Sequence, residues 1–130
     1  MIFTKYKFFL FTSHPERLVK FYSETLGFKI ISQLKWPKDR GYMVEVSPGY
    51  EIWIAYHSKV KAKNQDPYRH ILNIYTTEVE NLFKKLKAVE GVRVIQSPVS
   101  MGKVVPGETR LVATILDPEG NCLQFMEPSK

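Results

Sequence analysis

An internal repeat with a spacing of 64 residues restricts the fold of this chain more than any other feature. Each copy holds a Ser or Thr followed three positions later by Glu, then apolar residues at helical spacing, then a glycine. The matched pairs are Ser13 with Thr77, Glu16 with Glu80, Leu18 with Leu82, and Gly27 with Gly91. Because one offset shared by separate signals is hard to obtain by chance, the sequence predicts two copies of a single structural unit.

Each copy is predicted to contain one helix near its start. The segments 13–16 and 77–80 are typical of a capping box, in which Ser13 or Thr77 begins the helix and a Glu three positions later closes it. Gly27 and Gly91 suit the left-handed backbone position that ends a helix.

Four strands are predicted in each copy from runs of apolar and β-branched residues bounded by turn residues. In the first copy they lie within residues 1–12, 28–34, 42–46 and 50–56. In the second they lie within 70–75, 92–96 and 111–127, the last segment holding two strands, and residues 97–109 form a loop. We therefore expect one α+β domain of two tandem β-α-β-β-β modules, about 1–56 and 70–130, joined by a polar linker at 57–69.

The segment 111–127 contains the most informative strand pair. Its turn, Asp-Pro-Glu-Gly at 117–120, combines residues that favour a tight reversal, and the Asp117 side chain can accept a hydrogen bond from the backbone two residues on. Alternation along the returning strand places Cys122, Gln124 and Met126 on one face. Gln124 is therefore a polar residue in mid-strand between two apolar ones, and what it faces decides the function.

The composition is that of an ordinary soluble globular protein. Of the 130 residues, 44% are hydrophobic and 25% are charged. There is no apolar run of about 18 residues, so we expect no membrane span. The amino terminus lacks the features of an export signal, and the single cysteine, Cys122, cannot form an internal disulfide. We expect a cytoplasmic protein in which Cys122 is a buried, unreactive thiol.

The net charge of +6 makes anions the favoured small molecules. The basic residues are scattered, apart from a cluster of Lys59, Lys61 and Lys63, and no nucleic-acid-binding motif accompanies them. A solvated lysine-rich surface accounts for this pattern better than a nucleic-acid interface does. We expect no nucleic-acid or membrane partner and a ligand that is small and anionic.

Three segments resemble one known family. They are Pro15-Glu16-Arg17 through Phe21-Tyr22, then Leu26-Gly27-Phe28, and then Asp117-Pro118-Glu119-Gly120-Asn121. With the repeat, they make the chain similar to the vicinal oxygen chelate superfamily, which includes glyoxalase I, bleomycin resistance proteins, fosfomycin-modifying enzymes and extradiol dioxygenases. The resemblance implies a glyoxalase-like mixed sheet that curls around a ligand cavity, and it implies a homodimer.

In metal-dependent members of that superfamily, His and Glu side chains hold a divalent ion on the first and last strands of each half. In the second half, His70 matches the first of these positions, whereas Gln124 stands where a carboxylate is usual. In the first half, Tyr6 or Lys7 falls at one position and Trp53 at the other, with Glu51 the nearest carboxylate. Since a catalytic site normally needs about three ligands, the resemblance implies a pocket without a tight metal site.

The resemblance points to six ligand-binding candidates and leaves the catalytic residue open, with His70 the best candidate for a general base. Arg110 closes a loop, residues 103–110, that is either a lid over the ligand or a plain surface connection. The candidates are His70, Gln124, Glu51, Trp53, Tyr6 and Arg110.

Three functions stay open on the sequence. The first is a glyoxalase- or bleomycin-resistance-like protein that binds a small organic molecule without metal or other cofactor, with His70 and Gln124 as its polar contacts. The second is an enzyme of the same superfamily, a lyase, isomerase, transferase or dioxygenase, with a divalent metal in an atypical site or with His70 acting as a base alone. The third is a non-catalytic accessory subunit.

Overall fold

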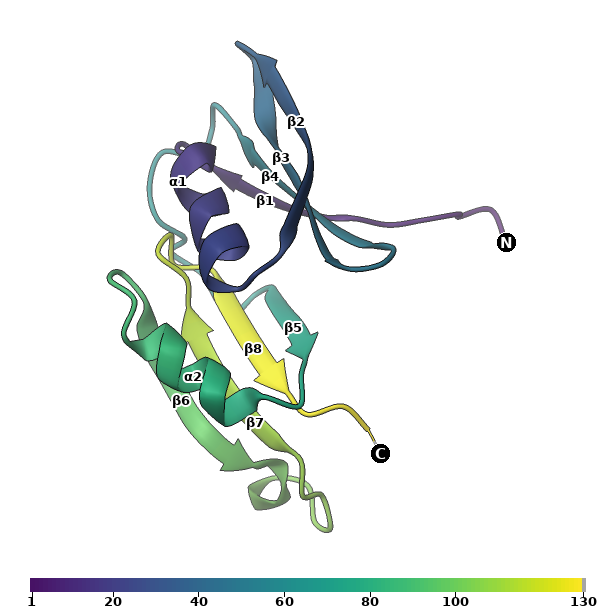
Figure 1. Ribbon diagram of the computed structural model, residues 1–130, viewed down its shortest axis with the longest axis vertical. Helices are drawn as coiled ribbons and strands as arrows, with labels where there is room; N and C mark the ends of the chain where they lie inside the picture. The colour runs from purple at the N-terminus through teal and green to yellow at the C-terminus, as the bar shows by residue number, and fades with distance from the viewer. Residues whose placement is uncertain (130) are drawn as a thin grey trace. The chain divides into compact units, whose positions relative to one another are not determined.

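The computed structural model describes residues 1–129 and divides the chain into two compact units, one of residues 1–62 and one beginning at Lys63. Both units have the predicted β-α-β-β-β order (Figure 1). The fold is α+β, with a four-stranded mixed sheet in each module. Among the described residues, no helix has the length and apolar character that a membrane span requires.

The first unit builds its sheet in the order β1-β4-β3-β2, with β1 parallel to β4 and the other neighbours antiparallel. A short π-helical segment, η1 (Phe21–Thr25), continues the helix. The remaining elements are β1 (Phe8–Thr12), α1 (Pro15–Lys20), β2 (Lys29–Trp36), β3 (Asp39–Ser47) and β4 (Tyr50–Tyr56).

The second unit repeats this topology in the order β5-β8-β7-β6, again with one parallel pair, β5 and β8. A 3-10 turn, η2 (Met101–Lys103), follows β6. The other elements are β5 (Ile71–Tyr75), α2 (Val79–Lys87), β6 (Arg93–Ser100), β7 (Leu111–Leu116) and β8 (Cys122–Met126). The duplication predicted from the 64-residue spacing is therefore confirmed in the strand order of both sheets.

Each helix packs on one face of its own sheet and forms the core there. In the second unit α2 lies against β6 and β7 (Figure 1), and Phe83 and Leu86 of the helix are buried together with the alternate residues Leu123 and Phe125 of β8. Burial of such side chains contributes about 1.5–3 kcal/mol each. The opposite side of this sheet, here called the helix-free face, carries Gln124.

The predicted capping boxes are wrong. Equivalent hydrogen bonds to a threonine of each copy are found in their place, so the two copies still match. The N-cap residues are His14 and Glu78, and neither helix has a side-chain cap. Instead the hydroxyls of Thr12 and Thr76 accept hydrogen bonds of 3.0 Å from the backbone N–H of His14 and Glu78. A threonine hydroxyl that bonds to the backbone two residues on closes a common type of local turn. Each hydroxyl therefore orders the connection between strand and helix and not the first turn of the helix.

Several strand limits also differ from the prediction. The connection between the strands predicted at 28–34 and 42–46 is shorter than expected, because β2 continues to Trp36 and β3 begins at Asp39. Gly41 lies inside the sheet opposite Ala55. A Cβ atom at Gly41 would lie 2.6 Å from the Cβ of Ala55, so this glycine permits close strand approach. In the second unit β6 continues to Ser100, with irregularities in its pairing to β7, and the loop begins later than expected.

The turn between β7 and β8 is organised by Asp117, whose side chain is only 1% exposed. Its Oδ1 atom accepts hydrogen bonds from the backbone N–H of Glu119 at 2.8 Å and of Asn121 at 3.0 Å, and its Oδ2 accepts from the Asn121 side chain at 3.0 Å. Gly120 adopts the left-handed conformation with φ of 82°. The predicted turn is confirmed, and it sets the starting register of β8.

We expect Asp117→Ala to lower the free energy of unfolding by about 1.5–3 kcal/mol, since hydrogen bonds to a charged group are lost and backbone donors are left without their acceptor. Urea denaturation followed by circular dichroism measures this change. The exposed Glu90 provides a matched control, because Glu90→Ala removes a carboxylate from the surface and should alter stability by less than about 0.5 kcal/mol. Equal effects of the two substitutions would contradict the role given to Asp117.

Candidate functional site

A row of uncharged polar side chains crosses the helix-free face of the second sheet. Cross-strand pairing aligns Asn73 of β5 with Gln124 of β8, Gln124 with Thr114 of β7, and Thr114 with Gln96 of β6. These four residues are here called the polar row. Within it the Gln124 Nε2 atom donates a hydrogen bond of 3.2 Å to Asn73 Oδ1. Gln124, Asn73 and Thr114 are all partly exposed.

The polar row lies between two mostly apolar rows. On one side are Ile71, Cys122, Leu116 and Arg93, and on the other are Tyr75, Met126, Val112 and Val99. Cys122 is buried, as expected from the sequence, and burial, with a further contribution from the nearby Asp117 charge, raises the pKa of its thiol. A raised pKa disfavours the reactive thiolate, so this cysteine is a buried packing residue rather than a nucleophile.

His70 stands apart from the polar row. It is exposed and occupies a bend directly before β5, three residues ahead of Asn73. Three residues of extended chain span about 10 Å, and an odd spacing reverses the direction of the side chain. Among the described residues, no hydrogen bond or ion pair joins His70 to Gln124. The pair predicted to act together is therefore not in direct contact, and the partner of Gln124 is Asn73.

The first-unit candidates have separate surroundings. The Glu51 carboxylate accepts a hydrogen bond from Lys5 Nζ at 2.9 Å and lies 3.7 Å from Lys7 Nζ. The hydrogen bond from Lys5 is the main cause that lowers the pKa of Glu51, and the positive charges of both lysines add to it. Trp53 is buried at 8% exposure, whereas Tyr6, ahead of β1, is 81% exposed. Glu51 is thus already neutralised by ammonium groups.

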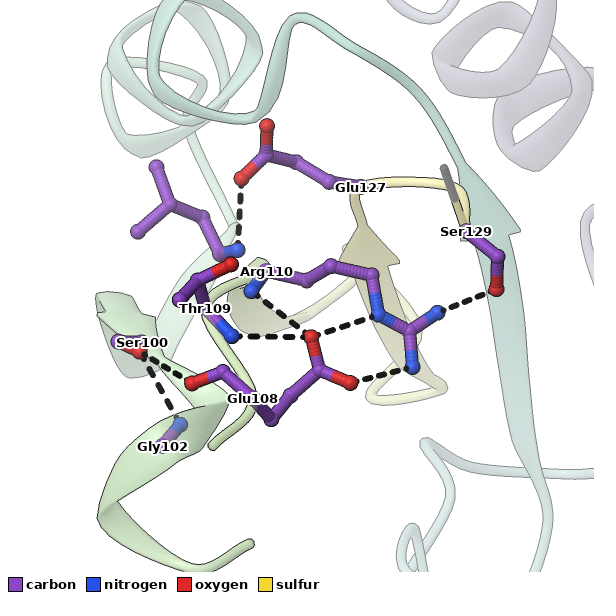
Figure 2. A network of polar contacts seen from close by, with 8 residues as sticks. Ser100, Gly102, Glu108, Thr109, Arg110, Glu127 and Ser129 are labelled. Atoms are coloured by element: carbon purple, nitrogen blue, oxygen red, sulfur yellow. Dashed lines mark hydrogen bonds and ion pairs between the residues drawn. The ribbon is translucent and has the colours of Figure 1, made fainter. Parts of the chain in front are cut away.

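Arg110 is held by a carboxylate of its own loop (Figure 2). Its Nε and Nη2 atoms donate to Glu108 Oε1 and Oε2 at 3.0 and 3.1 Å, and its Nη1 donates to Ser129 Oγ at 3.1 Å. Glu108 Oε1 also accepts from the backbone N–H of Thr109 and of Arg110, both at 3.0 Å. A two-pronged Arg–carboxylate pair is among the stronger hydrogen-bonded arrangements, so this guanidinium is engaged within the loop.

The start of the same loop is tied down by Ser100. Its hydroxyl accepts from the Gly102 N–H at 3.0 Å and donates to the Glu108 carbonyl oxygen at 3.4 Å (Figure 2). On the other side, Glu127 Oε1 accepts from the Leu111 N–H at 2.7 Å. The loop predicted as either a lid or a surface connection is therefore cross-linked at both ends by side chains.

The donor set does not fit a divalent metal in either unit. Among the residues that the structure describes, no three His, Cys, Asp or Glu side chains gather in one place. In the second unit Gln124 offers a neutral amide that is bonded to Asn73, and in the first Glu51 is paired with lysines. Divalent ions in proteins are generally held by several imidazole, thiolate or carboxylate donors, which these positions lack.

The sequence patterns did not identify Asn73 and Thr114 as candidate site residues. Asn73 interrupts the apolar run of β5 just as Gln124 interrupts that of β8, so the same signal was available at both positions. No local pattern shows that β5 pairs with β8, because Asn73 and Gln124 lie 51 residues apart in the sequence.

The pairing with Arg110 predicts a strongly acidic Glu108. The hydrogen bonds from the Arg110 side chain, followed by those from the backbone, lower the pKa of Glu108 from 4.5 to about 2. Because the pKa is depressed in the folded state, the stabilisation is complete above pH 4.5 and is lost as the pH falls toward 2. A carbon-13 NMR titration of the side-chain carboxyl should give a midpoint near 2.

Arg110→Ala should raise that midpoint toward the ordinary value, whereas Arg93→Ala, which removes a guanidinium outside this network, should leave it in place. A midpoint near 4.5 in the unaltered protein would show that the Glu108–Arg110 pair does not persist in solution.

Many solved structures have the same fold. Three of them share 17–18% of their residues with this chain. A superfamily member from Sphaerobacter thermophilus superposes with a TM-score of 0.75 at 18% identity, over 98% of this chain and 99% of that one. The trypanothione-dependent glyoxalase I of Leishmania major gives 0.74 at 17% identity, over 96% and 86%. A mutant glyoxalase I from Zea mays gives 0.71 at 17% identity, over 94% of this chain but 43% of that one.

The chain therefore spans less than half the length of the maize enzyme. No curated protein sequence matches it significantly. The family model described as the Glyoxalase/Bleomycin resistance protein/Dioxygenase superfamily matches residues 6–125, which is nearly the whole sequence. Together with the two β-α-β-β-β modules, this match establishes that the chain belongs to the glyoxalase/bleomycin resistance protein/dioxygenase superfamily.

Proposed function

We propose that this protein binds a small organic molecule on the helix-free face of its second sheet, with Gln124 and Asn73 as the principal polar contacts. The observation that carries the proposal is the polar row, which sets hydrogen-bonding groups between two largely apolar rows. Binding sites for small molecules are typically lined by apolar side chains with a few placed polar groups. Membership of a superfamily that binds small molecules supports the same conclusion.

The hydrogen-bonding capacity of the row suits recognition. A glutamine amide has two N–H donors and an oxygen with two acceptor sites, and the bond to Asn73 uses one of the donors. The same bond holds the Gln124 side chain in place, so less conformational entropy is lost when a ligand binds. Thr114 adds a hydroxyl that both donates and accepts.

The proposal includes no tight divalent metal site. Gln124 replaces the carboxylate that the superfamily resemblance leads one to expect, and it retains no charge with which to hold a cation. Glu51 would first have to give up its contacts with Lys5 and Lys7. We keep His70 in the proposal as a polar contact for a ligand that extends from Asn73 along β5, past Ile71, to the start of that strand.

The other four candidate residues, the net charge and the expected homodimer enter the proposal separately from the polar row. Glu51, Trp53 and Tyr6 lie in the first unit and Arg110 is bound to Glu108, so none of them belongs to the polar row. The net charge of +6 supports attraction of anionic molecules from a distance, and the superfamily resemblance supports a homodimer.

A library of small aromatic and aliphatic fragments, screened by chemical-shift perturbation in nitrogen-15-labelled protein, tests the site. We expect the responding signals to come from β5, β7 and β8, including the side-chain amides of Gln124 and Asn73. Gln124→Leu should weaken the best fragment about tenfold, because one directed hydrogen bond is lost. Gln33→Leu, the same change in the middle of β2, serves as the control and should leave affinity unchanged.

Fragments that perturb other parts of the chain only, or a Gln124→Leu variant that binds as the unaltered protein does, would refute the proposed site.

Calorimetric titration with zinc, nickel and manganese tests the metal-free part of the proposal. We expect no binding at one equivalent per chain and no change in the melting temperature after dialysis against a chelator. The donor set explains this, because the amide of Gln124 neither carries charge nor gains it near neutral pH. One equivalent of metal bound by the protein and lost in His70→Ala would contradict it.

A further inference from the structure

We propose that the polar row recognises an uncharged carboxamide group, such as a primary amide or lactam, on an apolar small molecule. This inference rests on the proposed binding site and names the chemical class that the site takes. It follows from which hydrogen-bonding groups the row presents and from how charge is distributed around it.

Each member of the row carries both a donor and an acceptor, and none carries a charge. The bond from Gln124 to Asn73 uses one N–H and accepts at the Asn73 oxygen, so the pair keeps the oxygen and second N–H of Gln124 and the two N–H groups of Asn73. A carboxamide presents the complementary set, a carbonyl that accepts and N–H groups that donate. A carboxylate presents acceptors only and would face the Gln124 oxygen without a donor.

The surrounding charges favour the same class. In the two rows that flank the polar row on the described sheet, Arg93 is the one residue with a permanent charge, and it is exposed on the edge strand β6. Arg110, one of the ligand-binding candidates, is bound through two of its nitrogen atoms to Glu108. An ionised group placed against neutral amides and apolar side chains loses hydration that no opposite charge replaces.

The apolar rows indicate the rest of the ligand. Of the apolar residues in the flanking rows, Ile71 on one side and Tyr75 and Val112 on the other are exposed or partly exposed, so they offer contact surface to an aromatic ring. Residues two positions apart on one strand lie about 6.6 Å apart, so a ring that carries one carboxamide reaches from the polar row to either flank. Benzamide is the minimal molecule with both features.

Three molecules of almost equal shape test the proposal, since benzamide is neutral, benzoate is an anion and benzamidine is a cation near neutral pH. Each is titrated into nitrogen-15-labelled protein while the side-chain amide signals of Gln124 and Asn73 are followed. We expect benzamide to bind at least about tenfold more tightly than either ion, because only benzamide satisfies donors and acceptors together without burying charge.

The isosteric variant Gln124→Glu replaces the amide with a carboxylate and should reverse the preference, so that benzamidine becomes the tightest of the three and benzamide weakens about tenfold. Gln33→Glu makes the same change in β2 and should keep the preference of the unaltered protein.

The outcomes separate this inference from the proposed function. If benzoate binds as well as benzamide and both depend on Gln124, the carboxamide class is wrong while the binding site stands. If none of the three molecules perturbs the Gln124 and Asn73 signals while other fragments do, the class is again wrong and the site stands. If no fragment of any kind perturbs the row, both are wrong.

Discussion

The buried Asp117 carboxylate is the interaction on which the arrangement of the second unit depends. By accepting hydrogen bonds from two backbone N–H groups of its own turn, it fixes where β8 begins relative to β7. Side chains alternate across a strand, so a slip of one residue would carry Gln124 to the helix side and Phe125 to the helix-free face. The turn thus decides both which residues form the core and which residues form the polar row.

The central strand β8 contributes residues both to the core of the second unit and to the polar row. β8 pairs in parallel with β5 and antiparallel with β7, and its alternate residues Leu123 and Phe125 are buried. Leu123 and Phe125 stabilise the unit by their burial, while Gln124 between them points to the opposite face and is partly exposed. A scaffold of this kind permits new ligands through changes at single exposed strand positions, consistent with a superfamily in which one fold carries many activities.

Long-range charge and short-range contacts have different consequences in this molecule. The excess of basic residues creates a field that attracts anions over distances of about a Debye length. At the polar row, however, the side chains are neutral, and Arg110 is occupied by Glu108. The excess charge would therefore not speed the encounter with the uncharged ligand proposed here, whose selectivity would come from the polar row alone.

Local patterns in the sequence determined the duplicated topology, the β7–β8 turn and the mid-strand polar position of Gln124, because repeats, turn residues and alternation depend on neighbours along the chain. They did not determine that Thr12 and Thr76 order the strand-to-helix turns, where Ser13 and Thr77 were expected to cap the helices, because several hydroxyls lay within reach of the same N–H groups. Only the tertiary structure decided that Gln124 meets Asn73 rather than His70. That contact joins strands distant in sequence, and its partner is chosen by the register of a parallel pair, which no local signal encodes.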